Sequence, residues 1–144
     1  MSKTEDINFG LTNEQKAIPS IESFLKTELK KDPNPYSIYD WWNETKTVFV
    51  ELKSRRNTHN QYDTTIIGEN KIQMCTNPDI KYYFVFLFTD GLYYIKYDKE
   101  LFKNFTIEKD LRIKYRYDVG KVEFKKVVHI PYKLLNKLPN TIII

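Results

Sequence analysis

Residues 47–53 read Thr-Val-Phe-Val-Glu-Leu-Lys, an apolar run that ends in a carboxylate and, two residues later, an ammonium group. Such a run predicts a buried strand that presents charged side chains at its end. Because side chains alternate across a strand, Glu51 and Lys53 share one face and Leu52 points to the other. Asp40 closes another short aromatic segment upstream. Two carboxylates and a lysine can therefore converge, which is the outline of a site for a metal ion and a water molecule.

The length and composition favour one compact domain. With 144 residues, 41% of them hydrophobic, the chain can bury a real core, so we expect residues 1–144 to form a single domain whose polar residues 1–10 are flexible. No apolar run is long enough for a membrane span, and the first residues lack the basic and then apolar pattern of a signal peptide. We therefore expect an intracellular protein with no membrane partner.

Basic residues are concentrated toward the C-terminus. Residues 91–144 contain 12 Lys and Arg against 6 Asp and Glu, whereas residues 1–50 contain 6 against 8. A basic segment with interleaved tyrosines suits a nucleic-acid backbone, since Lys and Arg contacts with phosphates release counterions. The alternative is a solvated, lysine-rich hairpin.

The apolar pattern predicts a helix, a hairpin and then further helices and strands. A main helix is expected over about residues 19–30, with Pro19 near its start and a short turn capped by Thr12 before it. Strands are expected over residues 36–42, 47–54, 81–89, 92–97, 111–117 and 122–130, with hairpin turns at Asp90-Gly91 and at residues 118–120. Short helices are expected near residues 68–74, 99–104 and 131–138. The segment from residue 62 to the second helix is expected to be a loop. This order of elements predicts an α/β fold with a central mixed sheet, in which Asp40 and Glu51 lie on facing strands.

Asp40, followed by Glu51-Leu52-Lys53 after an apolar strand and behind an N-terminal helix, resembles the PD-(D/E)XK nuclease superfamily. The run Phe-Val-Glu-Leu-Lys-Ser-Arg-Arg at residues 49–56 is similar to small stand-alone nuclease-like proteins of phages and large DNA viruses. The resemblance covers about residues 14–88. The proline of the PD-(D/E)XK motif is absent, since Tyr39 stands directly before Asp40.

The resemblance implies a restriction-endonuclease-like fold, with a central mixed β-sheet flanked by helices, and a nuclease that hydrolyses DNA with a divalent cation. Such an enzyme, an endonuclease rather than an exonuclease, would act in phage or viral DNA processing, recombination or repair. Asp40, Glu51 and the backbone carbonyl of Leu52 would hold Mg²⁺ or Mn²⁺. Lys53 would position or help deprotonate the attacking water, and a cation beside it would depress its pKa. Members of the superfamily often dimerise, so a homodimer is a further expectation.

Other side chains are candidates for the edges of this site. Glu22, next to the apolar stripe of the first helix, is an additional candidate metal ligand. Glu14 extends the other end of that stripe, and either carboxylate could reach the site or be a solvated flank of the helix. Arg55 and Arg56 leave the catalytic strand directly and are candidates for contacts with the DNA backbone. Candidates for lining the same groove are Gln61, Tyr62 and Lys71.

Two functions of other classes fit the same residues. A Glu-x-Lys pair on a strand is also common as an exposed ion pair worth only about 0.2 to 1 kcal/mol. The chain would then be either a non-catalytic nucleic-acid-binding module or a protein-interaction module on a nuclease-like scaffold. The first predicts salt-dependent binding that is indifferent to Asp40→Ala, and the second predicts no affinity for nucleic acid.

Overall fold

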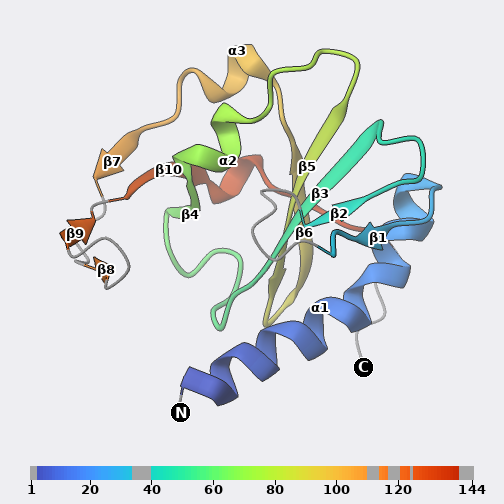
Figure 1. Ribbon diagram of the computed structural model, residues 1–144, viewed down its shortest axis with the longest axis horizontal. Coiled ribbons are helices and arrows are strands. Elements are labelled where there is room, and N and C mark those ends of the chain that lie inside the picture. The colour runs from blue at the N-terminus through green and yellow to red at the C-terminus, as the bar shows by residue number, and fades with distance from the viewer. Residues whose placement is uncertain (1–2, 34–39, 110–113, 117–120, 124, 140–144) are drawn as a thin grey trace.

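The computed structural model describes residues 3–33, 40–109, 114–116, 121–123 and 125–139 (Figure 1). Its centre is a six-stranded sheet in the order β1-β2-β3-β5-β6-β11. β3 and β5 are parallel, and the other neighbouring pairs are antiparallel. The bounds of these strands are β1 Lys30–Lys31, β2 Trp41–Trp42, β3 Val48–Ser54, β5 Lys81–Phe88, β6 Gly91–Lys96 and β11 Asn136–Lys137. The predicted α/β fold with a central mixed sheet is confirmed.

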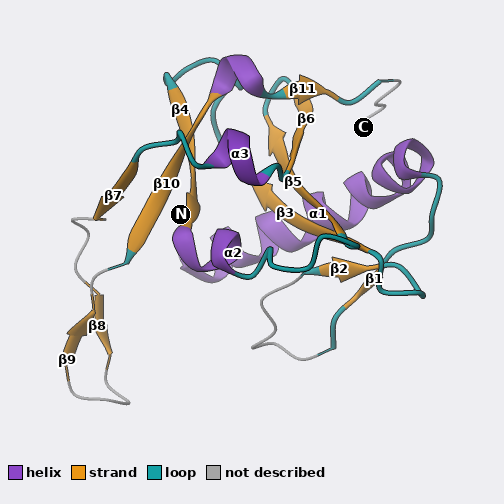
Figure 2. Cartoon of the chain, turned by 90° about the horizontal axis from the view of Figure 1, so that it is seen from above, coloured by secondary structure: helices purple, strands orange, loops and turns teal. Residues whose placement is uncertain are grey.

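Two smaller sheets and several helices complete the described chain. An antiparallel sheet has the order β4-β10-β7, and β8 pairs with β9 in a hairpin that extends away from the other elements (Figure 2). The strand bounds are β4 Thr64–Gly68, β7 Ile107–Lys109, β8 Lys114–Arg116, β9 Lys121–Glu123 and β10 Lys126–Pro131. The helices are α1 Lys3–Leu25, α2 Glu69–Gln73, α3 Lys99–Phe102 and a 3₁₀ turn at Tyr132–Leu134. Within the described ranges, no helix combines the length and apolar character needed to cross a membrane.

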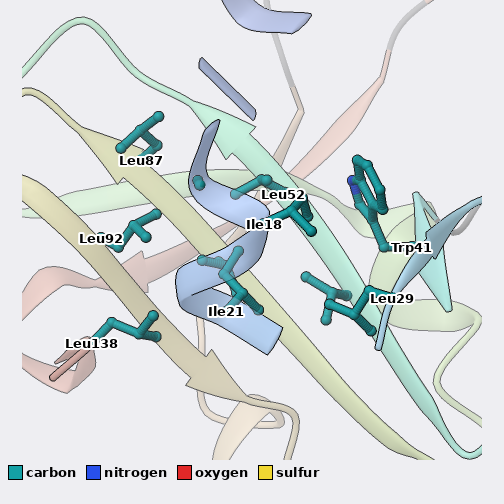
Figure 3. Close-up of a cluster of buried hydrophobic side chains, with 11 residues drawn as sticks. Ile18, Ile21, Leu29, Trp41, Leu52, Leu87, Leu92 and Leu138 are labelled. Carbon is teal, nitrogen blue, oxygen red and sulfur yellow. The ribbon is translucent and has the colours of Figure 1, made fainter. Parts of the chain in front are cut away.

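The two faces of the central sheet carry different cores. On one face, Ile18 and Ile21 of α1 pack with aliphatic residues of the sheet such as Leu52 (Figure 3). On the other face, aromatic residues of β5 pack under β4, β10 and α3. Because side chains alternate along β3, its apolar positions Val50 and Leu52 face α1, and Glu51 is directed to the aromatic side. The sheet pleat therefore decides which core surrounds the carboxylate.

Asn43 organises the turn that joins β2 to β3. Its side-chain oxygen accepts hydrogen bonds from the backbone N–H groups of Thr47 at 2.9 Å and Val48 at 3.0 Å. Lys46 in this turn has a φ of 56°. The resulting hairpin pairs Trp41 with Val50, which brings Asp40 opposite Glu51. The predicted juxtaposition of these two strands is confirmed, although residues 36–39 of the first predicted strand lie outside the described residues.

The first helix begins and ends earlier than predicted, since it stops at Leu25 and Lys30 already belongs to β1. α1 runs from Lys3 through Pro19, so Thr12 is not its N-cap and the residues from Lys3 onward are helical. Pro19 is exposed, while Ala17, Ile18 and Ile21 beside it are buried against the sheet. The burial of these three apolar side chains offsets the loss of the backbone hydrogen bond that a proline cannot donate inside a helix.

The other differences lie in the second half of the chain. Residues 64–68, expected to be a loop, form β4, which pairs with β10 along five positions. The expected closing helix over residues 131–138 is only the 3₁₀ turn, followed by β11 against β6. In both segments, pairing with strands distant in sequence decides the backbone, and local propensity does not reveal such partners. The hairpin predicted at Asp90-Gly91 is confirmed, while the turn at residues 118–120 lies outside the described residues. β8 pairs with β9 as expected, but the expected strand over residues 122–130 is divided between β9 and β10, which belong to different sheets.

Arg55 connects β3 to the second sheet. Its guanidinium donates to the Ile66 carbonyl of β4 at 3.0 Å and lies 5.9 Å from the centre of the Phe86 ring. Its backbone N–H donates to the Leu87 carbonyl at 2.8 Å. The side chain thus fixes β4 over the aromatic face of the central sheet.

We predict that Arg55→Ala lowers the free energy of unfolding by about 1 to 3 kcal/mol, because the Ile66 carbonyl loses a charged donor. The control substitution Lys16→Ala, at an exposed position of α1, should change it by roughly 0.5 kcal/mol or less. Urea denaturation followed by circular dichroism measures both. Equal losses in the two variants would contradict the bridging role of Arg55.

Candidate functional site

Glu51 lies at the centre of the candidate site. Its side chain is only 5% exposed, and Oε1 lies 3.1 Å from Nζ of Lys53 and 3.4 Å from Nζ of Lys71. Both ion pairs are made by Oε1, whereas Oε2 has no hydrogen-bond partner in the part of the chain that the structure describes. A buried carboxylate oxygen without a donor is costly unless a ligand satisfies it.

Asp40 closes the site at the open edge of β3. Its Oδ2 accepts a hydrogen bond from the Leu52 N–H at 3.3 Å. The N–H and C=O of one residue point to the same side of a strand. The register of β2 on β3 stops at Val50, so the Leu52 carbonyl is directed to the same edge as Asp40. The predicted residues Asp40, Glu51, Leu52 and Lys53 are therefore brought together.

The carboxylate that α1 brings to the site is Glu14 and not Glu22. Glu14 is near enough to Asp40, Lys53 and Glu51 for their charges to shift its pKa. The Glu22 side chain instead accepts the Leu29 N–H at 2.8 Å, beyond the C-terminal end of α1. Glu14 stands three, four and seven residues before the buried positions 17, 18 and 21, so a charged residue in register with the apolar stripe was the available signal.

Burial governs the ionisation of the carboxylates. Burial, with a contribution from Asp40, raises the pKa of Glu14 to about 7. Burial also raises the pKa of Glu51, and the nearby ammonium groups of Lys53 and Lys71 oppose the rise without cancelling it. Both shifts favour the protonated, neutral form of the acid.

Lys53 remains a cation. Burial alone would lower its pKa, but the carboxylates of Glu51 and Asp40 outweigh burial and raise it. The depressed pKa expected from the sequence presupposed a metal ion as the dominant neighbour, whereas the dominant neighbour here is Glu51 at 3.1 Å. Lys53 is therefore a hydrogen-bond donor and a positive charge at neutral pH.

The donor atoms fit a small, hard cation. In the described ranges, no three His, Cys, Asp or Glu side chains gather into a complete metal cluster. Mg²⁺, however, is usually held by one or two carboxylates and keeps waters and substrate phosphates as its other ligands. The unsatisfied Oε2 of Glu51, the Asp40 carboxylate and the Leu52 carbonyl are oxygen donors of that kind.

The predicted DNA-contact residues divide into three groups. Arg55 is engaged with the Ile66 carbonyl, as described above, and Lys71 lies inside the site against Glu51. Gln61 and Tyr62, the latter 60% exposed, lie with Arg56 in the loop over residues 55–63 that follows β3. Only this third group presents exposed side chains beside the end of the strand that carries Glu51.

The mixed sheet with an acidic pair and a lysine at the edge of β3 defines a restriction-endonuclease-like protein with a PD-(D/E)XK site pattern. A family model described as "Phage putative PDDEXK endonuclease" matches residues 7–138, and the chain belongs to this family. A comparison with curated proteins finds no match.

The pKa of Glu14 predicts a pH-dependent stability. Because the folded-state pKa of about 7 exceeds the ordinary 4.5, the unfolded chain releases this proton first as the pH rises. Stability therefore falls between these two values, by about 2 kcal/mol after allowance for partial exposure. Glu14→Gln should remove that part of the decline.

The measurement is urea denaturation of the wild type and Glu14→Gln in metal-free buffer at several pH values across this window. Glu28→Gln, a substitution at an exposed position, serves as the charge-matched control and should follow the wild type. If the Glu14→Gln curve declines as steeply as the other two, Glu14 does not titrate near pH 7.

Proposed function

We propose that the chain is a divalent-metal-dependent DNA endonuclease that hydrolyses phosphodiester bonds at the Asp40, Glu51 and Lys53 site. The observation that carries this proposal is Glu51, a carboxylate that is 5% exposed and whose Oε2 has no hydrogen-bond partner among the described residues. Core strands do not retain such a group for stability, because replacing it by an apolar side chain would remove its desolvation cost.

Asp40 and Glu51 would hold the cation, with the Leu52 carbonyl as a third donor and Glu14 beside them. Mg²⁺ or Mn²⁺ bound there supplies Lewis-acid stabilisation of charge on the scissile phosphate and a more acidic water. Asp40 also fixes its own position through the Leu52 N–H, so the two carboxylates are held by one rigid strand. Such preorganisation is what a charged transition state requires.

Lys53 acts as a positively charged donor in this proposal. In the metal-free protein its raised pKa keeps the ammonium protonated, and in this form it can orient the attacking water or a phosphate oxygen. Its place two residues after Glu51 puts both side chains on one face of β3.

DNA is the substrate that the surroundings favour. The chain carries a net charge of +4, and its basic residues are concentrated in residues 91–144. Arg56, Gln61 and Tyr62 lie in the loop that leaves β3, where an exposed arginine can contact phosphates and an exposed tyrosine can contact sugar or base.

The test is cleavage of a covalently closed circular plasmid, because an exonuclease finds no end on it. We predict that the wild type nicks the plasmid with Mg²⁺ or Mn²⁺ and does not do so with EDTA. Glu51→Gln and Asp40→Asn should lower the rate by at least about 100-fold, since each removes a charged ligand. Glu28→Gln, at an exposed position outside the site, should cleave like the wild type.

Undiminished cleavage by Glu51→Gln would show that the activity belongs to another site. If the wild type cuts no DNA but binds it in a salt-dependent manner that Asp40→Asn leaves unchanged, the chain is a non-catalytic binding module. If it neither cuts nor binds, a protein partner becomes the alternative to pursue.

A further inference from the structure

Two ammonium groups share one carboxylate oxygen in this site. Lys53 Nζ and Lys71 Nζ lie 3.1 and 3.4 Å from the same Oε1 of Glu51. The three side chains come from different layers, since Lys71 belongs to α2 and the other two belong to β3. One carboxylate oxygen is thus faced by two positive charges at contact distance.

The surroundings of this oxygen strengthen the repulsion between the two ammonium groups. Glu51 and Lys71 line a small pocket whose other walls are mainly aromatic side chains, among them Phe49, Tyr82 and Phe84. Charges attract and repel one another far more strongly in such a setting than in water. A divalent cation that approaches Glu51 meets two ammonium groups, and at least one of them has to withdraw.

Lys71 is the better placed of the two to withdraw. Lys53 is part of a strand that is paired with β5 through Ser54, and its contact with Glu51 is the shorter. Lys71 reaches the carboxylate from a helix of only five residues, which has no side-chain N-cap. One-turn helices depend on tertiary packing, so a change in a side-chain contact there disturbs few backbone hydrogen bonds.

We propose that Lys71 is a gate between metal and DNA: its ammonium leaves Glu51 when the carboxylate takes a divalent cation, and it then binds a phosphate oxygen of the substrate. This inference rests on the proposed nuclease function. The phosphodiester backbone of a bound substrate offers an anionic acceptor at the same place, and a charge-assisted hydrogen bond from an ammonium group to a phosphate oxygen is strong. Metal and DNA binding are therefore coupled through Lys71, each favouring the other.

Metal affinity without DNA tests the first half of the gate. Isothermal titration calorimetry with Mn²⁺ should give about three- to tenfold tighter binding for Lys71→Met than for the wild type, because one repelling charge is gone. Lys71→Arg, which keeps the charge, should bind Mn²⁺ like the wild type. Lys103→Met is the control, since Lys103 contacts Glu100 on the exposed surface of α3.

DNA affinity tests the second half. In fluorescence anisotropy with a labelled duplex, replacing EDTA by Ca²⁺ should tighten binding by the wild type and by Lys103→Met. For Lys71→Met this tightening should be at least about threefold smaller than for the wild type, because its phosphate contact is absent. The same substitution thus strengthens metal binding and weakens metal-dependent DNA binding, which a merely structural lysine would not do.

Amine footprinting tests the gate in the unaltered protein and does not depend on the folding of any variant. Reaction with an acylating reagent, read by mass spectrometry, should label Lys71 more strongly when Mn²⁺ is added and less strongly when DNA follows in Ca²⁺ buffer. Labelling of Lys103 should stay constant.

The outcomes separate the gate from the nuclease proposal. If Lys71→Met binds Mn²⁺ no more tightly than the wild type, or if Mn²⁺ does not increase labelling of Lys71, the gate is wrong while the metal site stands. If the wild type binds no metal at all, both the gate and the proposed function are overturned.

Discussion

The burial of Glu51 is the constraint on which the rest of the site depends. A carboxylate that is 5% exposed on a central strand is unfavourable by itself, and its pKa rises for that reason. Lys53 and Lys71 offset part of the cost at one oxygen, and the other oxygen has no donor among the described residues. The fold therefore leaves one oxygen of a buried carboxylate unsatisfied, and this is the observation behind the proposed cation site.

Three structural features hold the ligands around that carboxylate. The pleat of β3 directs Glu51 and Lys53 to one face of the sheet and directs Leu52 to the opposite face, where it packs against α1. The Asn43 turn sets the register that brings Asp40 to the strand edge, where it accepts the Leu52 N–H. The stripe of α1 that packs on the sheet continues into Glu14. Each of these carboxylates is thus positioned by packing or by a hydrogen bond to the backbone of β3 or its neighbours.

The sequence predicted those elements in which the local pattern and the tertiary contacts favour the same backbone structure. The apolar runs of β3 and β5, the Asp90-Gly91 hairpin and the meeting of Asp40 with Glu51 follow from period and turn chemistry. β4 and β11 were missed because only distant strands reveal them, and the start of α1 was missed because packing overrides Pro19. Glu14 and Lys71 show the same limit at the site: their types were noticed, but the helices that bring them to Glu51 are placed by contacts that the sequence does not display. Arg55 was predicted to contact DNA because it directly follows β3. Its actual partner, the Ile66 carbonyl, could not be foreseen because it belongs to β4, a strand that was not predicted.

The most direct test of the central claim is the position of a bound metal ion. A crystal grown with Mn²⁺ and measured for anomalous scattering should show a peak between the Asp40 and Glu51 carboxylates and the Leu52 carbonyl, and the peak should be absent in Glu51→Gln. A peak elsewhere on the molecule, in a protein that cleaves DNA with Mn²⁺, would contradict the account of Glu51 as the buried ligand around which this fold is built.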